Sequence, residues 1–147
     1  MTDWPRQPDG RTCAPSAVVA AEHLLARSAL PWPGFRDEVF AMHRRLTGFR
    51  DRHGRLQPPW TRLLGTPPWA VARELNGRVH RYRRSEVLAA LPAPVPVYLG
   101  SRWLPRHVVL VVDERDGEPL AYNPARGTVD LLSSSRWKRT WWAVLPR

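Results

Sequence analysis

Cysteine and lysine are nearly missing from this chain, and its 147 residues contain no long apolar run. Cys13 is the single cysteine, which excludes an intramolecular disulfide and a cysteine-rich zinc site. The apolar stretch at 108–112, which no other run in the chain exceeds, is far shorter than the roughly 18 residues that a membrane-spanning helix needs. The N-terminus has no apolar signal core, so we expect a protein without a transmembrane segment that does not follow the Sec route.

The cationic residues are unevenly chosen, with 22 arginines beside the single lysine, Lys138. The formal net charge is +10 and the pI is about 11.4, values that raise the question of an anionic partner. The arginines are scattered, however, and their excess together with abundant Ala, Pro and Trp is typical of a GC-rich coding bias. We interpret them as a solvated basic face, which disfavours a nucleic-acid partner and leaves an anionic cell wall open.

Helix signals occupy the first two-thirds of the chain. The run CAPSAVVAAEHLLAR predicts a buried helix over 13–27, with Thr12 placed to cap it and Pro15 in its first turn. Apolar residues at helical spacing predict a second helix from Phe35 that Gly48 ends. Two short helices are expected at 66–76 and 85–91, the latter capped by Ser85, with a loop over 49–65 that contains a short turn at 60–64.

Strand signals dominate the last third. Strands are expected at 79–83, 95–99, 107–113, 119–122, 128–132 and 141–145, and Asp116-Gly117 is a hairpin turn signal between two of them. Helices followed by strands indicate an α+β domain. We therefore predict one domain over 1–147, in which N-terminal helices pack on a C-terminal antiparallel sheet.

Cys13 has the residue environment that thiol chemistry needs. It lies in the first turn of the predicted helix, where free N–H groups and the helix dipole favour a thiolate and a developing oxyanion. Gln7, six residues upstream, carries a side-chain amide that could donate to the same oxyanion if the intervening turn folds back over the thiol.

His107 is the predicted general base, because it alone among five histidines opens a strongly apolar strand. His23 lies about 15 Å along the first helix from the cysteine, too far to act on it. We expect His43, His53 and His80 to be surface residues.

Asn123 is the predicted partner of the imidazole. The Asp116-Gly117 turn folds the end of the next strand back beside His107, so that Asn123 could accept from one ring nitrogen. Asp113 and Asp130 are alternatives, although Asp113 lies some 20 Å along the same strand.

These residues resemble a known family. The order of Gln7, Cys13 within TCAPSA, a late RHVVLVVD strand and a YNPARG strand end is similar to the papain-like cysteine peptidases, and most similar to their small bacterial C39-like branch. The resemblance implies a papain-like fold with Cys13 as nucleophile, His107 as base, Asn123 as orienting residue and Gln7 as oxyanion donor. Two positions depart from the pattern: Ala14 follows the cysteine, where Gly is usual, and Asn123 replaces the Asp common in that branch.

The resemblance implies cleavage of a peptide or amide bond through a thioester, with a peptide or protein substrate and no metal or cofactor. Three tryptophans are candidates for the walls of a substrate cleft: Trp60, Trp69 and Trp103. A bacterial effector with the same triad, acting as peptidoglycan amidase, glutamine deamidase or acyltransferase, is an alternative, as is a basic binding module without catalysis. A cytoplasmic location and export by a signal-peptide-independent system are both compatible with the sequence, which leaves the oligomeric state undetermined.

Overall fold

The computed structural model describes residues 4–48, 52–56, 66–137 and 139–147. Its helices are α1 (Cys13–Leu25), α2 (Phe35–Thr47), α3 (Pro68–Glu74) and α4 (Arg84–Ala90). All four predicted helices are present, and α2 ends before Gly48 as expected. The turn predicted at 60–64 lies outside the described residues.

Of the two predicted helix caps, the position of Thr12 is confirmed and that of Ser85 is wrong. Thr12 is the N-cap residue of α1, but its side chain makes no capping hydrogen bond; its hydroxyl donates to the carbonyl oxygen of Asp9 at 3.2 Å instead. Ser85 lies inside α4, whose N-cap is Arg83.

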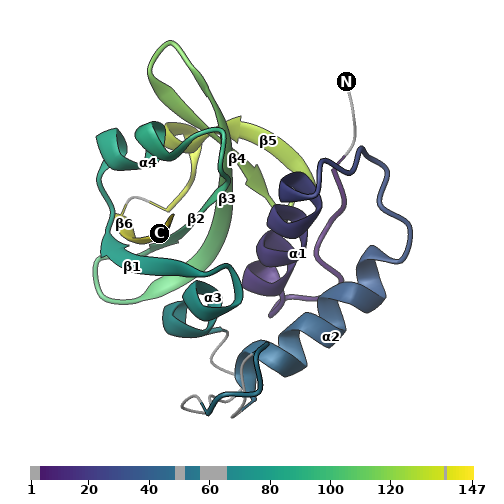
Figure 1. Cartoon of the computed structure of the whole chain (residues 1–147). Coiled ribbons are helices and arrows are strands. Elements are labelled where there is room, and N and C mark those ends of the chain that lie inside the picture. The colour runs from purple at the N-terminus through teal and green to yellow at the C-terminus, as the bar shows by residue number, and fades with distance from the viewer. Residues whose placement is uncertain (1–3, 49–51, 57–65, 138) are drawn as a thin grey trace.

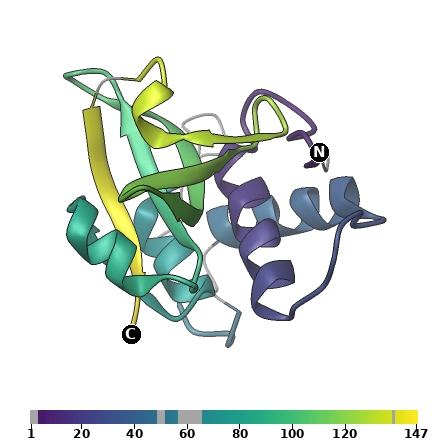
Figure 2. The same ribbon diagram turned by 90° about the horizontal axis from the view of Figure 1, so that it is seen from above.

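Six antiparallel strands form one sheet in the order β1-β6-β2-β3-β4-β5. Their bounds are β1 (Gly77–Arg81), β2 (Val95–Gly100), β3 (Pro105–Arg115), β4 (Glu118–Asn123), β5 (Thr128–Leu131) and β6 (Arg139–Pro146), with a short 3-10 turn η2 (Leu132–Ser134) after β5. The last strand of the chain thus pairs with β1 and β2. The predicted α+β fold is confirmed, with the helices of the N-terminal half packed on the sheet (Figures 1 and 2).

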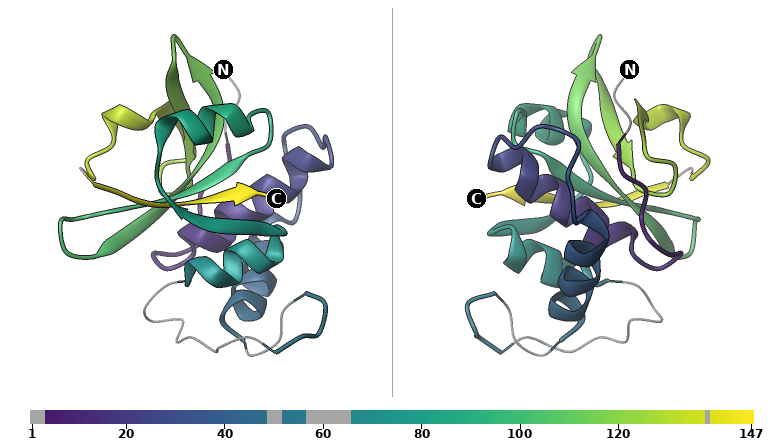
Figure 3. Two further views of the ribbon diagram at one scale, coloured as in Figure 1. Left: turned by 60° about the vertical axis from the view of Figure 1, so that its left-hand side comes forward. Right: turned by 90° about the vertical axis from the view of Figure 1, so that its right-hand side faces the viewer.

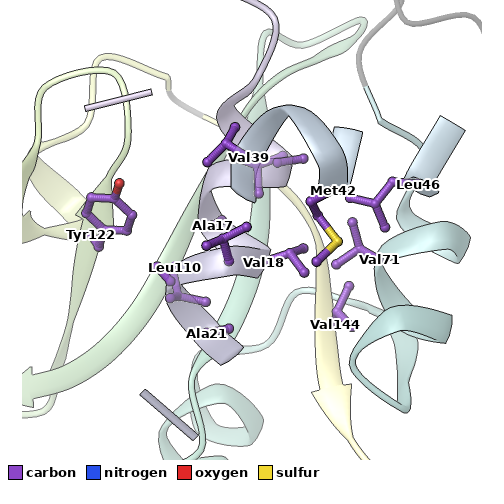
Figure 4. Packing of buried hydrophobic residues seen from close by; sticks show 14 of the residues in the cluster. Ala17, Val18, Ala21, Val39, Met42, Leu46, Val71, Leu110, Tyr122 and Val144 are labelled. Atoms are coloured by element: carbon purple, nitrogen blue, oxygen red, sulfur yellow. The ribbon is translucent and has the colours of Figure 1, made fainter. Parts of the chain in front are cut away.

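Helix α1 lies between the sheet and α2, which explains why its sequence is apolar all round (Figure 4). Its residues from Ala14 to Ala21 are all buried. Leu110 and Tyr122 of the sheet pack on one side of it, and Val39 and Met42 of α2 belong to the same core. The small alanine side chains allow this close approach, so α1 is held firmly at the position where it begins, at Cys13.

A second core fills the opposite face of the sheet, beneath α4. Strand alternation divides β3 between the two faces: Val108 and Leu110 face α1, whereas Val109 and Val111 join Val87 of α4. This burial on both faces explains the near-continuous apolar run of β3. The first residues of the strand, Pro105 to His107, are less buried than the four that follow them. Within the described part of the chain, no helix is long and apolar enough to cross a bilayer.

Candidate active site

Cys13 is the first residue of α1, and its thiol lies against the start of β3. The residue is half-buried. Burial raises the pKa of the thiol, while hydrogen bonding to the backbone of Val108, Ala14 and Cys13 itself opposes that rise. Val108 directly follows His107 in the chain. The structure therefore brings the nucleophile candidate, from the N-terminal third, to the strand that carries the base candidate.

His107 and Asn123 form the hydrogen bond that the sequence predicts. Nε2 of the imidazole lies 2.8 Å from Oδ1 of Asn123. An amide oxygen only accepts, so Nε2 carries the proton and Nδ1 is the nitrogen with a free lone pair. The backbone N–H of Ala125 donates to the same Oδ1 at 3.1 Å, which holds the Asn123 side chain in place. Strand and turn together fix both the orientation and the tautomer of the ring.

The β3–β4 hairpin produces this juxtaposition. Its turn has positive φ at Asp116 and Gly117, 52° and 78°, which suits a tight two-residue connection. Leu110 then pairs with Tyr122, which brings the end of β4 alongside the start of β3. The expected hairpin geometry is confirmed, with an irregularity in the register between Val111 and Asp113 that the sequence did not indicate.

The imidazole is biased toward its neutral form. Burial lowers the pKa of His107, the hydrogen bond to Asn123 raises it, and the positive charge of Arg136 lowers it further. Arg136 lies in the loop before β6, and no motif in the sequence singles it out. A neutral ring with a free Nδ1 has the protonation state that a general base requires.

The thiol contacts the residue next to His107, but no hydrogen bond joins the thiol to the imidazole in the described chain. In the described part of the molecule, His107 makes one side-chain hydrogen bond, the one to Asn123. Burial favours the protonated thiol and the neutral imidazole. Both pKa shifts therefore act against a thiolate–imidazolium pair.

Gln7 lies beside the Asn123 turn. Its backbone N–H donates to the carbonyl oxygen of Pro124 at 2.8 Å, and its side-chain Nε2 donates to the carbonyl oxygen of Asp9 at 2.5 Å. Nearby, the Tyr122 hydroxyl donates to the Pro5 carbonyl oxygen at 2.5 Å, which ties the N-terminal segment to the sheet. Because one hydrogen of its amide is already used within the turn, the oxyanion role of Gln7 stays a prediction.

The alternative carboxylates do not replace Asn123 as the histidine's partner. Oδ1 of Asp113 accepts the N–H of Glu114 at 2.8 Å, near the far end of β3. Oδ2 of Asp130 accepts the Thr128 hydroxyl at 2.6 Å. Asn123 is therefore the residue that holds the imidazole in this structure.

The three tryptophan candidates have different surroundings. Trp103 is 76% exposed in the β2–β3 connection, with the guanidinium of Arg102 5.1 Å from its ring centre. Trp69, in α3, is half-buried and lines a hollow of about 310 Å³ together with Val79 and Arg147. Trp60 lies outside the described residues. Of the three candidates, Trp103 is the one near His107 in the sequence, four residues before it.

One histidine prediction is wrong. His43 is 6% exposed, because α2 turns it inward beside the buried Met42. His53 and His80 are exposed, as expected. His23 lies within α1, stacked on Trp32 and 3.1 Å from the Glu38 carboxylate, in agreement with the prediction that it takes no part with Cys13.

Neither of the two hollows contains Cys13, His107 or Asn123 among its lining residues. The larger, about 370 Å³, lies on the α4 side of the sheet and is lined by Tyr82, Arg84, Glu118 and Trp137 among others. These two hollows therefore do not mark the position of Cys13 and His107. Among the described residues, no cluster of three or more His, Cys, Asp or Glu side chains could hold a metal ion.

Comparison with known proteins supports the fold. The structure is similar to that of the peptidase domain of Streptococcus ComA, a bi-functional ABC transporter involved in a quorum-sensing pathway, with a TM-score of 0.59 and 16% identity over 100% of both chains. No family model matches the sequence, and no curated protein matches it. The likeness therefore shows a shared fold, the papain-like architecture that the motif order implies.

Proposed function

We propose that this protein is a cysteine peptidase-like amidohydrolase in which Cys13 is the nucleophile, His107 the general base and Asn123 the orienting residue. The observation that carries the proposal is the 2.8 Å hydrogen bond between His107 Nε2 and Asn123 Oδ1. It leaves Nδ1 available on a strand whose next residue contacts the thiol. The shared fold with a peptidase domain supports the same chemistry.

In the first step, Nδ1 of His107 takes the proton of the Cys13 thiol, and Sγ attacks the carbonyl carbon of the bound amide. The imidazolium that forms keeps its Nε2–H bond to Asn123, whose oxygen stabilises the positive ring. His107 then gives its proton to the leaving amine. The amide C–N bond breaks and a thioester on Cys13 remains.

In the second step, water attacks the thioester after His107 removes one of its protons. The C–S bond breaks, the carboxylic acid leaves, and the thiol recovers its proton. The oxyanion of both tetrahedral intermediates would be bound by the backbone N–H of Cys13, at the start of α1, and by the free amide hydrogen of Gln7. Hydrogen bonds from Gln7 to Pro124 and from Tyr122 to Pro5 join the N-terminal segment to the end of β4, which supports this role.

Incubation with a mixed peptide library, followed by mass spectrometry of the products, tests the proposal. New N-termini that appear with the wild-type protein and vanish with Cys13→Ser support hydrolysis. A mass gain of one unit at glutamine, or transfer of an acyl group to an added amine, would instead assign the deamidase or acyltransferase variant of the same site. Equal product patterns for wild type and Cys13→Ser, in this library and with purified muropeptides, would contradict the proposal and favour a binding module.

A further inference from the structure

Acidic and basic side chains are separated along β3. At its far end, the β3–β4 hairpin contains four carboxylates, those of Asp113, Glu114, Asp116 and Glu118, with one arginine, Arg115, among them. The β2–β3 connection lies at the other end of β3 from the β3–β4 turn (Figure 3). At this near end, where His107 lies, Arg102 is in the connection and Arg106 is the second residue of β3. With about 3.3 Å per strand residue, the seven residue steps from Arg106 to Asp113 separate the nearest members of the two groups by roughly 23 Å.

The start of β6 and the loop before it add two more cations to the near end. Arg139 pairs with Gly100, the last residue of β2, and Arg136 lies close enough to His107 to lower its pKa. All four arginines are exposed. The segments that form this end, 99–107 and 132–142, contain no Asp or Glu. We call Arg102, Arg106, Arg136 and Arg139 the basic rim.

Aromatic rings, and not carboxylates, hold three of these guanidinium groups. Arg102 lies 5.1 Å from the ring centre of Trp103, Arg136 4.6 Å from that of Trp137, and Arg139 4.5 Å from that of Trp141. The indole N–H of Trp141 donates to the Ser101 carbonyl oxygen at 3.0 Å and joins β6 to the β2–β3 connection. No salt bridge links a rim arginine to a carboxylate in the described part of the chain.

The basic rim therefore presents ordered, unneutralised positive charge next to the candidate base. We propose that the Cys13–His107 site selects peptides with acidic side chains flanking the bond that is cleaved, and that the basic rim binds those carboxylates. The proposal rests on the proposed function and names its substrate class. Guanidinium groups suit carboxylates because they donate two parallel hydrogen bonds to them.

An acidic peptide fits this arrangement better than a nucleic acid. Binding of a nucleic acid depends on neutralising successive phosphates along an extended track. Here the cations occupy one end of the sheet, and a long polyanion that continued along β3 would meet Asp113, Glu114 and the hairpin beyond them. A short acidic segment ending at the thiol avoids that repulsion.

Two alkylating agents that differ in charge test the potential at the thiol. The rates of Cys13 modification by anionic iodoacetate and neutral iodoacetamide are measured at low salt, and their ratio is divided by the same ratio for N-acetylcysteinamide. A basic rim that concentrates anions predicts a normalised ratio of about tenfold, which falls toward one at high salt. A normalised ratio near one at low salt would overturn the proposal.

Charge-neutralised variants locate the effect. Arg102→Gln/Arg139→Gln should reduce the normalised ratio to roughly threefold or less, because two of the four rim charges are lost. Arg36→Gln/Arg44→Gln, on α2, removes the same total charge, and Arg36 has the same kind of contact with an aromatic ring, 5.3 Å from the Phe40 ring centre. Equal ratios for the two double variants would show that net charge alone acts, and would contradict the rim.

Protection experiments separate the possible ligands. A pentaglutamate peptide with blocked termini should slow iodoacetamide modification of Cys13, whereas a blocked pentalysine peptide should not, and Arg102→Gln/Arg139→Gln should weaken the protection. Protection by a DNA oligonucleotide but not by the acidic peptide would overturn the proposal in favour of nucleic acid. If the charge preference is absent but alkylation still depends on His107, only the role of the basic rim is overturned. If alkylation does not depend on His107, the proposed function itself is overturned.

Discussion

The two halves of the site differ in how completely they are formed. His107 and Asn123 come from adjacent strands, are joined by a 2.8 Å hydrogen bond and are braced by the turn at Ala125. Cys13 comes from a helix on one face of the sheet, its pKa is raised by burial, and no hydrogen bond joins its sulfur to the imidazole in the described chain. The difference teaches that neighbouring groups hold the imidazole in place, whereas no hydrogen bond positions the thiol against it in the described chain.

Removal of the predicted base should have the largest effect. We expect His107→Gln to lower peptide cleavage by about 10²–10⁴-fold, because the side chain that is predicted to take the thiol proton is removed. The measurement is kcat/KM on a peptide identified from the library, with His23→Gln as the matched control on α1. A loss of less than threefold for His107→Gln would show that the strand half does not act on the thiol.

Removal of the orienting residue should have a smaller effect. Asn123→Ala should reduce kcat roughly 10²-fold with little change in KM, since the imidazole remains but loses its fixed tautomer and orientation. Asn123→Asp keeps an oxygen that accepts from Nε2 and should retain most of the activity. If Asn123→Asp were as inactive as Asn123→Ala, the hydrogen bond would not be the cause.

These features were accessible from the sequence to different degrees. The hairpin signal Asp116-Gly117 and the apolar run after His107 predict the strand half, because turn chemistry and strand alternation are local properties. The position of Cys13 at a helix start is local as well. Its distance from His107 is not, because it depends on how α1 packs between α2 and the sheet (Figure 4).

Long-range packing also explains the features that the sequence did not predict. Arg136 affects His107 only because β6, the last strand, inserts beside β2 and brings its preceding loop to that end of the sheet. His43 is buried because α2 turns that position toward the core, although its neighbours Arg44 and Arg45 predict a surface. The C-terminal strand carries no local signal of its partner in the sheet.

The pH dependence of Cys13 alkylation tests the same comparison with variants that shift the pKa of His107 and keep the imidazole in place. The pKa of His107 is lowered below 6.5. The acid limb, which is the pH range where the alkylation rate rises as the ring loses its proton, should therefore lie below pH 6.5. Arg136→Gln removes a cause of the lowering and should move the limb to higher pH. Asn123→Ala removes the opposing hydrogen bond and should move it to lower pH.

Shifts of the same sign in these two variants would contradict the assignment of the acid limb to His107. Arg115→Gln, at the far end of β3, is the control for loss of a positive charge on the same strand. We expect it to leave the acid limb unchanged.

The smallest expected effect is on stability. Because the folded protein holds His107 with a pKa below its ordinary 6.5, the unfolded chain binds more protons in that range. The contribution of His107 is therefore constant above pH 6.5, and stability declines as the pH falls through that value toward the lowered pKa. Urea denaturation at pH 7.5 and 5.5 should show a smaller decline for His107→Gln than for wild type. An equal decline in both proteins would show that other groups cause it.

The most direct test of the central claim is the rate at which iodoacetamide modifies Cys13 at pH 7, compared between wild type and His107→Gln. We predict that wild type reacts faster than N-acetylcysteinamide, although burial raises the thiol pKa, and that His107→Gln is at least about tenfold slower than wild type because the base is gone. If both proteins react at the same rate, no faster than the free thiol, then Cys13 and His107 do not form a thiol active site.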